Sequence, residues 1–123
     1  MTIKLKVSGA FHTPFMNSAY EKLSLELKSY EFTPPRIPLY SNTDAEPLDI
    51  NTVANKAAIQ VKSPVRWEQT IKNMIRDKAE MFIEVGAGKV LSGFLRKISP
   101  GVKFCNVEKY EDIEEAMQVA NNR

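Results

Sequence analysis

Apolar residues recur along the chain in two rhythms, an alternating one typical of strands and a spacing of three to four residues typical of helices. Alternation or dense apolar runs predict four short strands, over residues 3–7, 37–41, 81–85 and 102–107. Helical spacing predicts five helices, over residues 14–30, 50–60, 67–75, 90–98 and 113–120. Thr13 and Pro14 stand where the first helix should begin, and Asp49 is placed to cap the second.

Strands that alternate with helices are usually joined by right-handed crossovers, which make the sheet parallel and put helices on both faces. We therefore predict the α/β class, with a mostly parallel, short-stranded sheet flanked by helices. The 123 residues, 43% of them hydrophobic, fit a single domain over 1–123. Ligands gather at the carboxyl ends of such strands, where His12, Asn42 and the glycine turn 86–88 are expected to share a crevice.

Charge and composition exclude several kinds of protein. The net charge of +2 comes from 17 basic and 15 acidic residues that form no basic stripe, so we expect no nucleic-acid partner. Cys105 is the only cysteine, which excludes an internal disulfide and favours a reducing, cytoplasmic location. No long apolar stretch predicts a signal peptide or a membrane helix. The chain starts within a predicted strand, as a fragment cut from a larger domain would.

His12 is the only histidine, and it falls between a predicted strand and a predicted helix. Imidazole titrates near neutral pH, which suits it to general-base catalysis. The alternative is an ordinary surface or capping histidine, and the residues around it leave both interpretations open.

A general base needs a nucleophile, and acyl transfer by serine normally places it on a Gly-x-Ser-x-Gly elbow. The chain contains no such elbow. Ser8 and Ser92 adjoin glycines, but one lies in the same turn as His12 and the other falls in the middle of a predicted helix. We interpret both as structural.

The segment Gly86-Ala87-Gly88-Lys89 raises the alternative of a phosphate site, because backbone amides at the start of a helix attract anions. A dinucleotide-binding motif would need a glycine where Leu91 stands, and a P-loop would need Ser or Thr after the lysine. A tight turn that packs a helix onto its strand is the favoured interpretation.

Four segments together resemble the malonyl-CoA:acyl carrier protein transacylase family, in the family's order and approximate spacing. They are residues 7–16 (VSGAFHTPFM), 41–44 (SNTD), 60–67 (QVKSPVRW) and 82–91 (FIEVGAGKVL). The resemblance implies the C-terminal portion of an acyltransferase catalytic domain with an α/β-hydrolase-like core. The family's usual Gly-Pro-Gly is here Gly86-Ala87-Gly88.

In that family a serine attacks the malonyl thioester of coenzyme A, and the phosphopantetheine thiol of acyl carrier protein then collects the malonyl group. The resemblance places the histidine that activates both nucleophiles at His12. It implies that a main-chain carbonyl, here that of Gln60, orients the ring, and that Asn42 lines the substrate pocket. No metal or cofactor is implied, and the product serves fatty acid or polyketide biosynthesis.

The family's serine elbow, oxyanion hole, carboxylate-binding arginine and ferredoxin-like subdomain all precede this region. We therefore expect the isolated chain to be inactive and the missing N-terminal part of the domain to be a partner. Acyl carrier protein is acidic, so five basic residues could contribute to docking unless they simply form solvated helix faces: Lys62, Arg66, Lys89, Arg96 and Lys97. The alternative functions are a non-catalytic module that docks acyl carrier protein and, third, a nucleotide-binding domain.

Overall fold

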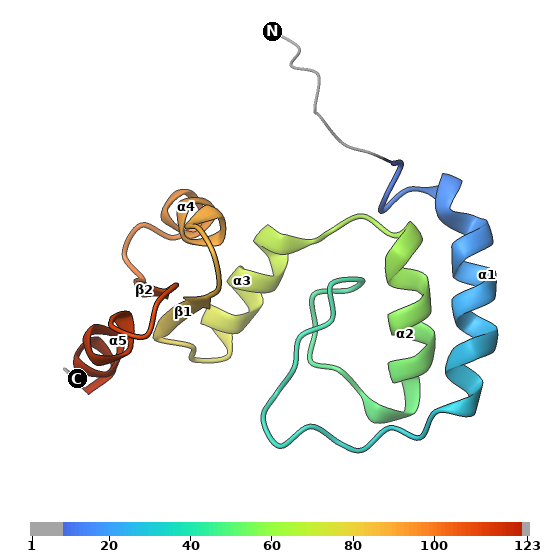
Figure 1. The fold of residues 1–123 in the computed structure, drawn as a ribbon, viewed down its shortest axis with the longest axis horizontal. Helices are drawn as coiled ribbons and strands as arrows, with labels where there is room; N and C mark the ends of the chain where they lie inside the picture. Colours follow the sequence, from blue (N-terminus) through green and yellow to red (C-terminus); the bar gives the residue numbers. More distant parts are fainter. Residues whose placement is uncertain (1–8, 122–123) are drawn as a thin grey trace, which may run out of the picture. The chain divides into compact units, whose positions relative to one another are not determined.

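The computed structural model describes residues 9–121, which fall into two compact units bounded by Met1–Thr70 and Ile71–Arg123 (Figure 1). The boundary lies within helix α3 (Trp67–Arg76). The strand predicted over 3–7, and with it Ser8, lies outside the described residues. The single domain over 1–123 stays a prediction. Within the described part of the chain, every helix is too short or too polar to span a membrane.

The N-terminal unit contains helices α1 (Asn17–Glu26) and α2 (Val53–Ile59), which pack side by side (Figure 1). Short 3-10 turns extend both helices: η1 (Pro14–Met16), η2 (Leu27–Ser29), η3 (Ile50–Thr52) and η4 (Gln60–Lys62). The Asp49 carboxylate accepts a hydrogen bond from the Asn51 amide at 3.0 Å, which confirms the predicted cap. Both helices predicted in this unit are therefore present, with ends that tighten into 3-10 geometry.

The strand predicted over 37–41 is wrong. This segment pairs only with a returning loop, through a single antiparallel bridge between Tyr40 and Pro47. The Ser41 amide donates to the Glu46 carbonyl at 2.9 Å, which closes the turn. Prolines remove amide donors from both arms, so the pairing does not extend into a ladder. Asn42 therefore lies in a local turn and not at the end of a parallel strand.

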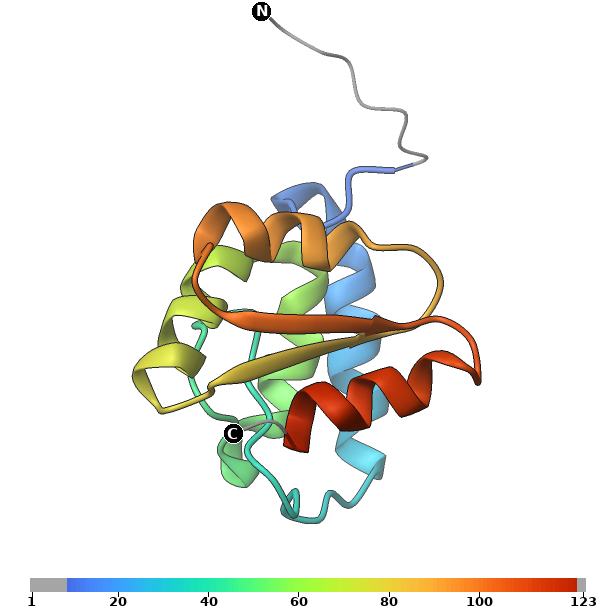
Figure 2. The same ribbon diagram turned by 90° about the vertical axis from the view of Figure 1, so that its left-hand side faces the viewer.

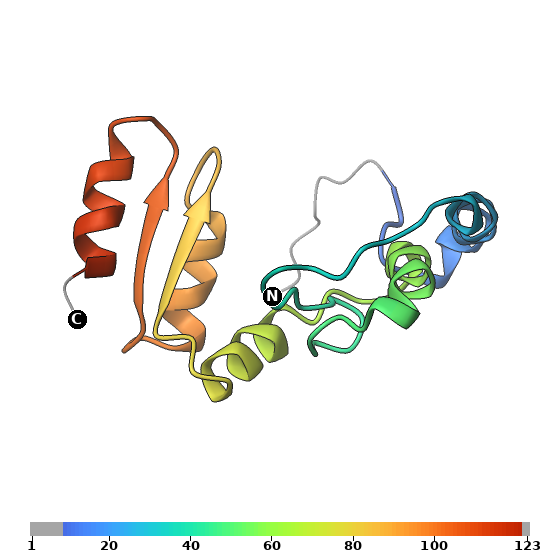
Figure 3. The same ribbon diagram turned by 90° about the horizontal axis from the view of Figure 1, so that it is seen from below.

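The C-terminal unit is built on two parallel strands, β1 (Met81–Val85) and β2 (Lys103–Val107). They pair in register from Met81 with Lys103 to Val85 with Val107. Helices α4 (Val90–Ile98) and α5 (Asp112–Asn121) lie on opposite faces of this sheet (Figures 2 and 3). The predicted α/β class with a parallel sheet flanked by helices is confirmed, with two strands among the described residues in place of four.

Buried apolar side chains are few in both units. In the C-terminal unit Leu95 of α4 is 3% exposed and Ala116 of α5 is 6% exposed, so each helix seals its own face of the sheet. Ile71, at 2%, is the largest fully buried side chain among the described residues. With so small a core, removal of one buried side chain is a large loss.

Candidate functional site

His12 lies in the turn that leads into η1 and α1, and its backbone is held in an uncommon conformation. Its φ of 62° is in the left-handed region, which is tolerated by histidine but costs about 1–3 kcal/mol. The main-chain amide of His12 donates to the Val61 carbonyl at 3.0 Å. Thr13 occupies the N-cap position, but its hydroxyl donates back to the Ala10 carbonyl at 2.7 Å and caps nothing. Long-range and local hydrogen bonds thus hold the turn in this conformation.

The imidazole ring makes the contact that decides its chemistry. Nδ1 of His12 lies 3.1 Å from the carbonyl oxygen of Gln60. A carbonyl oxygen only accepts hydrogen bonds, so the ring nitrogen beside it must carry the proton. In the neutral ring Nε2 then holds the free lone pair, and the side chain is only partly exposed. This tautomer is the one that a general base acting through Nε2 requires.

The Gln60 carbonyl is available because of its place in the chain. It lies in η4, directly after the end of α2, where helix carbonyls have no partner within the helix. The same oxygen accepts from the Ser63 amide at 3.2 Å, so both of its lone pairs are used. The structure places His12 and Gln60 in the arrangement that the resemblance implies. Their catalytic roles stay predictions.

Asn42 belongs to the same unit as His12 but has a different partner. Its Oδ1 accepts from the main-chain amide of Arg66 at 3.2 Å, directly before α3, and its Nδ2 is buried. Among the described residues no hydrogen bond joins Asn42 to His12. The contact ties the loop after Tyr40 to the start of α3, and the pocket-lining role of Asn42 stays a prediction.

The glycine turn at 86–88 lies in the other unit and is occupied by the chain's own carboxylate. Gly86 and Gly88 have φ values of 135° and 84°, which favour glycine. Glu84 then accepts from the amides of Leu91 and Ser92 at 3.0 and 2.8 Å and from the Ser92 hydroxyl at 2.6 Å. A carboxylate already fills the anion position at the start of α4, which argues against a phosphate there. The geometry supports the tight-turn interpretation and a structural Ser92, which lies in the first turn of α4 and not in the middle of the helix.

Sequence reasoning missed Glu84, although a signal was present. An acidic residue two positions before the glycine turn, with a serine in the first turn of the next helix, is the pattern of a strand carboxylate that caps that helix. The adjacent Asn106 side chain donates to the Gly88 carbonyl at 2.8 Å and closes the turn from β2.

Glu84 gives a pH-dependent prediction. Hydrogen bonds from the Ser92 hydroxyl, then from the Ser92 and Leu91 amides, lower the pKa of Glu84 below its ordinary value of 4.5. Because the folded pKa is the lower one, this stabilisation is complete above about pH 4.5 and is lost as the pH falls through the folded value. We expect Glu84→Gln to lower the free energy of unfolding at neutral pH and to lose this effect in acid. Urea titrations followed by circular dichroism measure the difference.

Glu80→Gln is the matched control for this prediction, because Glu80 is an exposed carboxylate directly before β1. The wild-type chain and Glu80→Gln should lose stability in parallel as the pH falls. If the gap between wild type and Glu84→Gln stays constant from neutral pH to about pH 3, the carboxylate does not cap α4.

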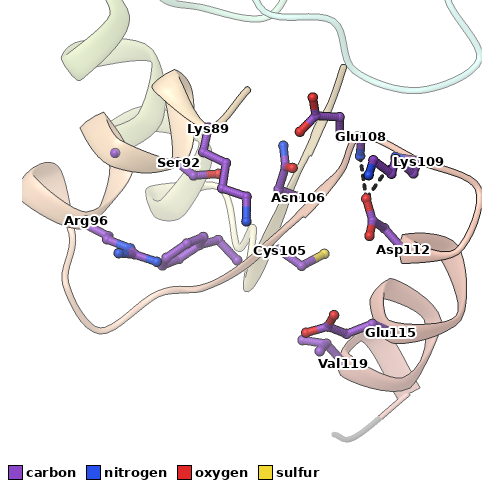
Figure 4. A pocket seen from close by; sticks show the side chains of 12 residues that line it. Lys89, Ser92, Arg96, Cys105, Asn106, Glu108, Lys109, Asp112, Glu115 and Val119 are labelled. Carbon is purple, nitrogen blue, oxygen red and sulfur yellow. Dashed lines mark hydrogen bonds between the residues drawn. The ribbon is translucent and has the colours of Figure 1, made fainter. Parts of the chain in front are cut away.

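A pocket lies along β2, between residues of α4 and α5 (Figure 4). None of His12, Gln60 and Asn42 lines it. Burial, with a smaller contribution from Glu115, raises the pKa of the Cys105 thiol, which keeps it protonated and a poor nucleophile. The lining mixes basic, acidic and small side chains: Lys89, Ser92, Gly93, Arg96, Phe104, Cys105, Asn106, Glu108, Lys109, Asp112, Glu115 and Val119. Cys105 therefore gives this pocket no activated nucleophile.

Within residues 9–121, no three His, Cys, Asp or Glu side chains come together as a metal site would need. The expectation that the chain needs no cofactor stays a prediction.

The resemblance to malonyl-CoA:acyl carrier protein transacylases is confirmed by similar proteins. A malonyl CoA-acyl carrier protein transacylase of Bacillus subtilis is 38% identical over 117 residues, which are 94% of this chain and 37% of that protein. A polyketide biosynthesis transacylase of the same organism is 37% identical over 98 residues, 80% of this chain and 34% of that protein. The chain thus spans little more than a third of the length of these two curated relatives. No family model matches it.

Solved structures agree with the sequence comparison. The crystal structure of MCAT from Streptococcus pneumoniae superposes with a TM-score of 0.88 at 37% identity, over 93% of this chain and 37% of that one. A malonyl CoA-acyl carrier protein transacylase from Clostridium perfringens also gives 0.88, at 35% identity, over 94% and 37%. The fold described above therefore matches a part of the fold of these transacylases.

Proposed function

We propose that this chain supplies the general base of a malonyl-CoA:acyl carrier protein transacylase. Such an enzyme moves a malonyl group from coenzyme A to the phosphopantetheine thiol of acyl carrier protein, in fatty acid or polyketide biosynthesis. The observation that carries the proposal is the contact between His12 Nδ1 and the Gln60 carbonyl, which leaves Nε2 as the proton acceptor. It joins two of the four segments that carry the family resemblance, residues 7–16 and 60–67.

In the first half-reaction, Nε2 of His12 takes the proton of a serine hydroxyl while the serine oxygen attacks the malonyl thioester. The tetrahedral intermediate then expels the coenzyme A thiolate, which recovers the proton from the imidazolium. In the second half-reaction, Nε2 takes the proton of the phosphopantetheine thiol, whose sulfur attacks the acyl-serine, and the serine oxygen recovers that proton. Throughout, the Gln60 carbonyl accepts from Nδ1 and stabilises the transient imidazolium.

We infer that the serine comes from the rest of the acyltransferase domain, and surfaces of the C-terminal unit support this. Ile83 and Val85 of β1 are 47% and 78% exposed, and Met117 of α5 is 59% exposed. Among the described residues β1 and β2 pair only with each other, so each keeps an open edge. Exposed apolar side chains beside an open strand edge favour packing of a further strand and helix.

We propose acyl carrier protein as the second partner. One structural neighbour, at 26% identity and a TM-score of 0.88, is a malonyl-transacylase in complex with a polyketide acyl carrier protein. Lys89 and Arg96 both line the pocket along β2, and their positive charges suit an acidic partner (Figure 4).

A chimera tests the proposed function. The segment of the Bacillus subtilis relative that matches this chain is replaced by residues 1–123, and malonyl transfer to acyl carrier protein is measured with purified components. We expect the chimera to turn over and the chain alone to give no transfer above buffer. A folded chimera that binds acyl carrier protein without transfer would favour the non-catalytic docking module. Turnover by the chain alone would contradict the prediction that this chain does not supply the nucleophilic serine.

A further inference from the structure

The base and its carbonyl partner are joined by more than their own hydrogen bond. Lys62 is the last residue of η4, two positions after Gln60. Its Nζ lies 2.9 Å from Oδ1 of Asn17 and 3.5 Å from the centroid of the Tyr20 ring, both in α1. Lys62 therefore attaches η4 to α1, which follows the His12 turn and η1.

The environment of the Lys62 ammonium is specific. Nδ2 of Asn17 donates to the Glu21 carboxylate at 2.7 Å, which fixes the amide so that its oxygen faces the lysine. The ammonium carries three protons and no acceptor, so an amide oxygen and an aromatic face both suit it. Lys62 and Tyr20 are only partly exposed.

We propose that Lys62 is a positioning residue for the His12 base. Two segments of the N-terminal unit meet at three points: the His12 amide with the Val61 carbonyl, His12 Nδ1 with the Gln60 carbonyl, and Lys62 with α1. The first two contacts must offset the conformational cost of the left-handed backbone at His12. The Lys62 contact holds η4 against α1, so the Gln60 carbonyl stays where His12 Nδ1 can donate to it.

This inference rests on the proposed function for its catalytic consequence only, because the contacts themselves are independent of any reaction. It also assigns Lys62 a role different from docking acyl carrier protein. A docking lysine extends into solvent, whereas the Lys62 ammonium is held by Asn17 and Tyr20.

The test reads the tautomer of His12 directly. As the only histidine in an untagged chain, His12 gives one pair of ring ¹⁵N signals, whose shifts report the ratio of the Nδ1–H to the Nε2–H form. In the wild-type chain the Nδ1–H form should dominate. Lys62→Met keeps the aliphatic stem and removes the charge, and we expect the ratio to fall at least about threefold.

Two controls accompany Lys62→Met. Lys62→Arg restores a cation and should recover the wild-type ratio, whereas Lys22→Met removes a charge from an exposed position of α1 and should leave it unchanged. A folded Lys62→Met with the wild-type ratio would overturn the proposal. If Lys62→Met does not fold, Asn17→Ala removes the oxygen acceptor and should lower the ratio in the same direction, and an unchanged ratio there overturns it as well.

The His12 tautomer ratio tests the role of Lys62, and the malonyl-transfer assay tests the proposed function, so the two proposals can fail independently. A chimera that is inactive but keeps the Nδ1–H form contradicts the proposed function and leaves the role of Lys62 intact. In an active chimera, Lys62→Met should lower kcat at least about threefold with little change in the KM for malonyl-CoA, because the residue acts through His12 and not through substrate binding. A lower affinity for acyl carrier protein at unchanged kcat would instead identify Lys62 as a docking residue.

Discussion

Replacement of His12 by alanine in an active chimera is expected to lower kcat for malonyl transfer by about 10²–10⁴-fold, the usual contribution of a general base. This corresponds to about 3–5 kcal/mol of transition-state stabilisation at 1.36 kcal/mol per tenfold change. The loss should appear in both half-reactions, because the same Nε2 accepts the proton of the serine and then that of the phosphopantetheine thiol. Single-turnover measurements of acyl-enzyme formation and of thiol transfer test the two steps separately.

Gln60→Ala is the matched control for His12→Ala. The contact to Nδ1 is made by the main-chain carbonyl, which alanine retains, and the Gln60 side chain is exposed. We expect kcat within about threefold of the parent chimera, the scale of a lost surface contact. A large loss in Gln60→Ala would show that the side chain takes part in the reaction. If the His12→Ala variant keeps its activity, His12 is not the general base.

The two partners of this site differ in how far the sequence could reveal them. His12 is conspicuous as a lone histidine between apolar segments. Gln60 is not, because a main-chain carbonyl leaves no trace in side-chain identity, and 48 positions separate the two residues. Only the resemblance pointed to Gln60. Lys62 was visible only as a charge, and its attachment to α1 requires the packing of two helices that periodicity alone cannot align.

The secondary structure shows the same division between local and long-range information. Helices α1 to α5 follow from apolar spacing, and prolines mark the stretches after α2 and α4. These signals are local. The segment 37–41 has the apolar content of a strand, yet a strand also needs a neighbour with free donors. Pro38 within the segment and Pro47 in the returning loop leave only one bridge. The Glu84 cap has a local signal, but recognising it requires knowing that the glycine turn brings the start of α4 to the Glu84 carboxylate.

The second large effect concerns stability. Leu95→Ala is expected to lower the free energy of unfolding by about 2–5 kcal/mol, the range for a leucine removed from a packed core. Leu95 is 3% exposed, and few other large side chains of the C-terminal unit are buried as deeply. Because small domains have a stability margin of similar size, the variant should unfold at a markedly lower urea concentration.

Leu91→Ala makes the same chemical change one helical turn earlier in α4, where the side chain is 40% exposed. Alanine retains the main-chain amide that donates to Glu84, so the cap at the start of the helix survives. We expect a loss below about 1 kcal/mol, because less apolar surface returns to water and no enclosed cavity forms. The comparison between the two leucines cancels the shared change in helix propensity. Equal losses at both positions would mean that Leu95 does not anchor α4 to the sheet.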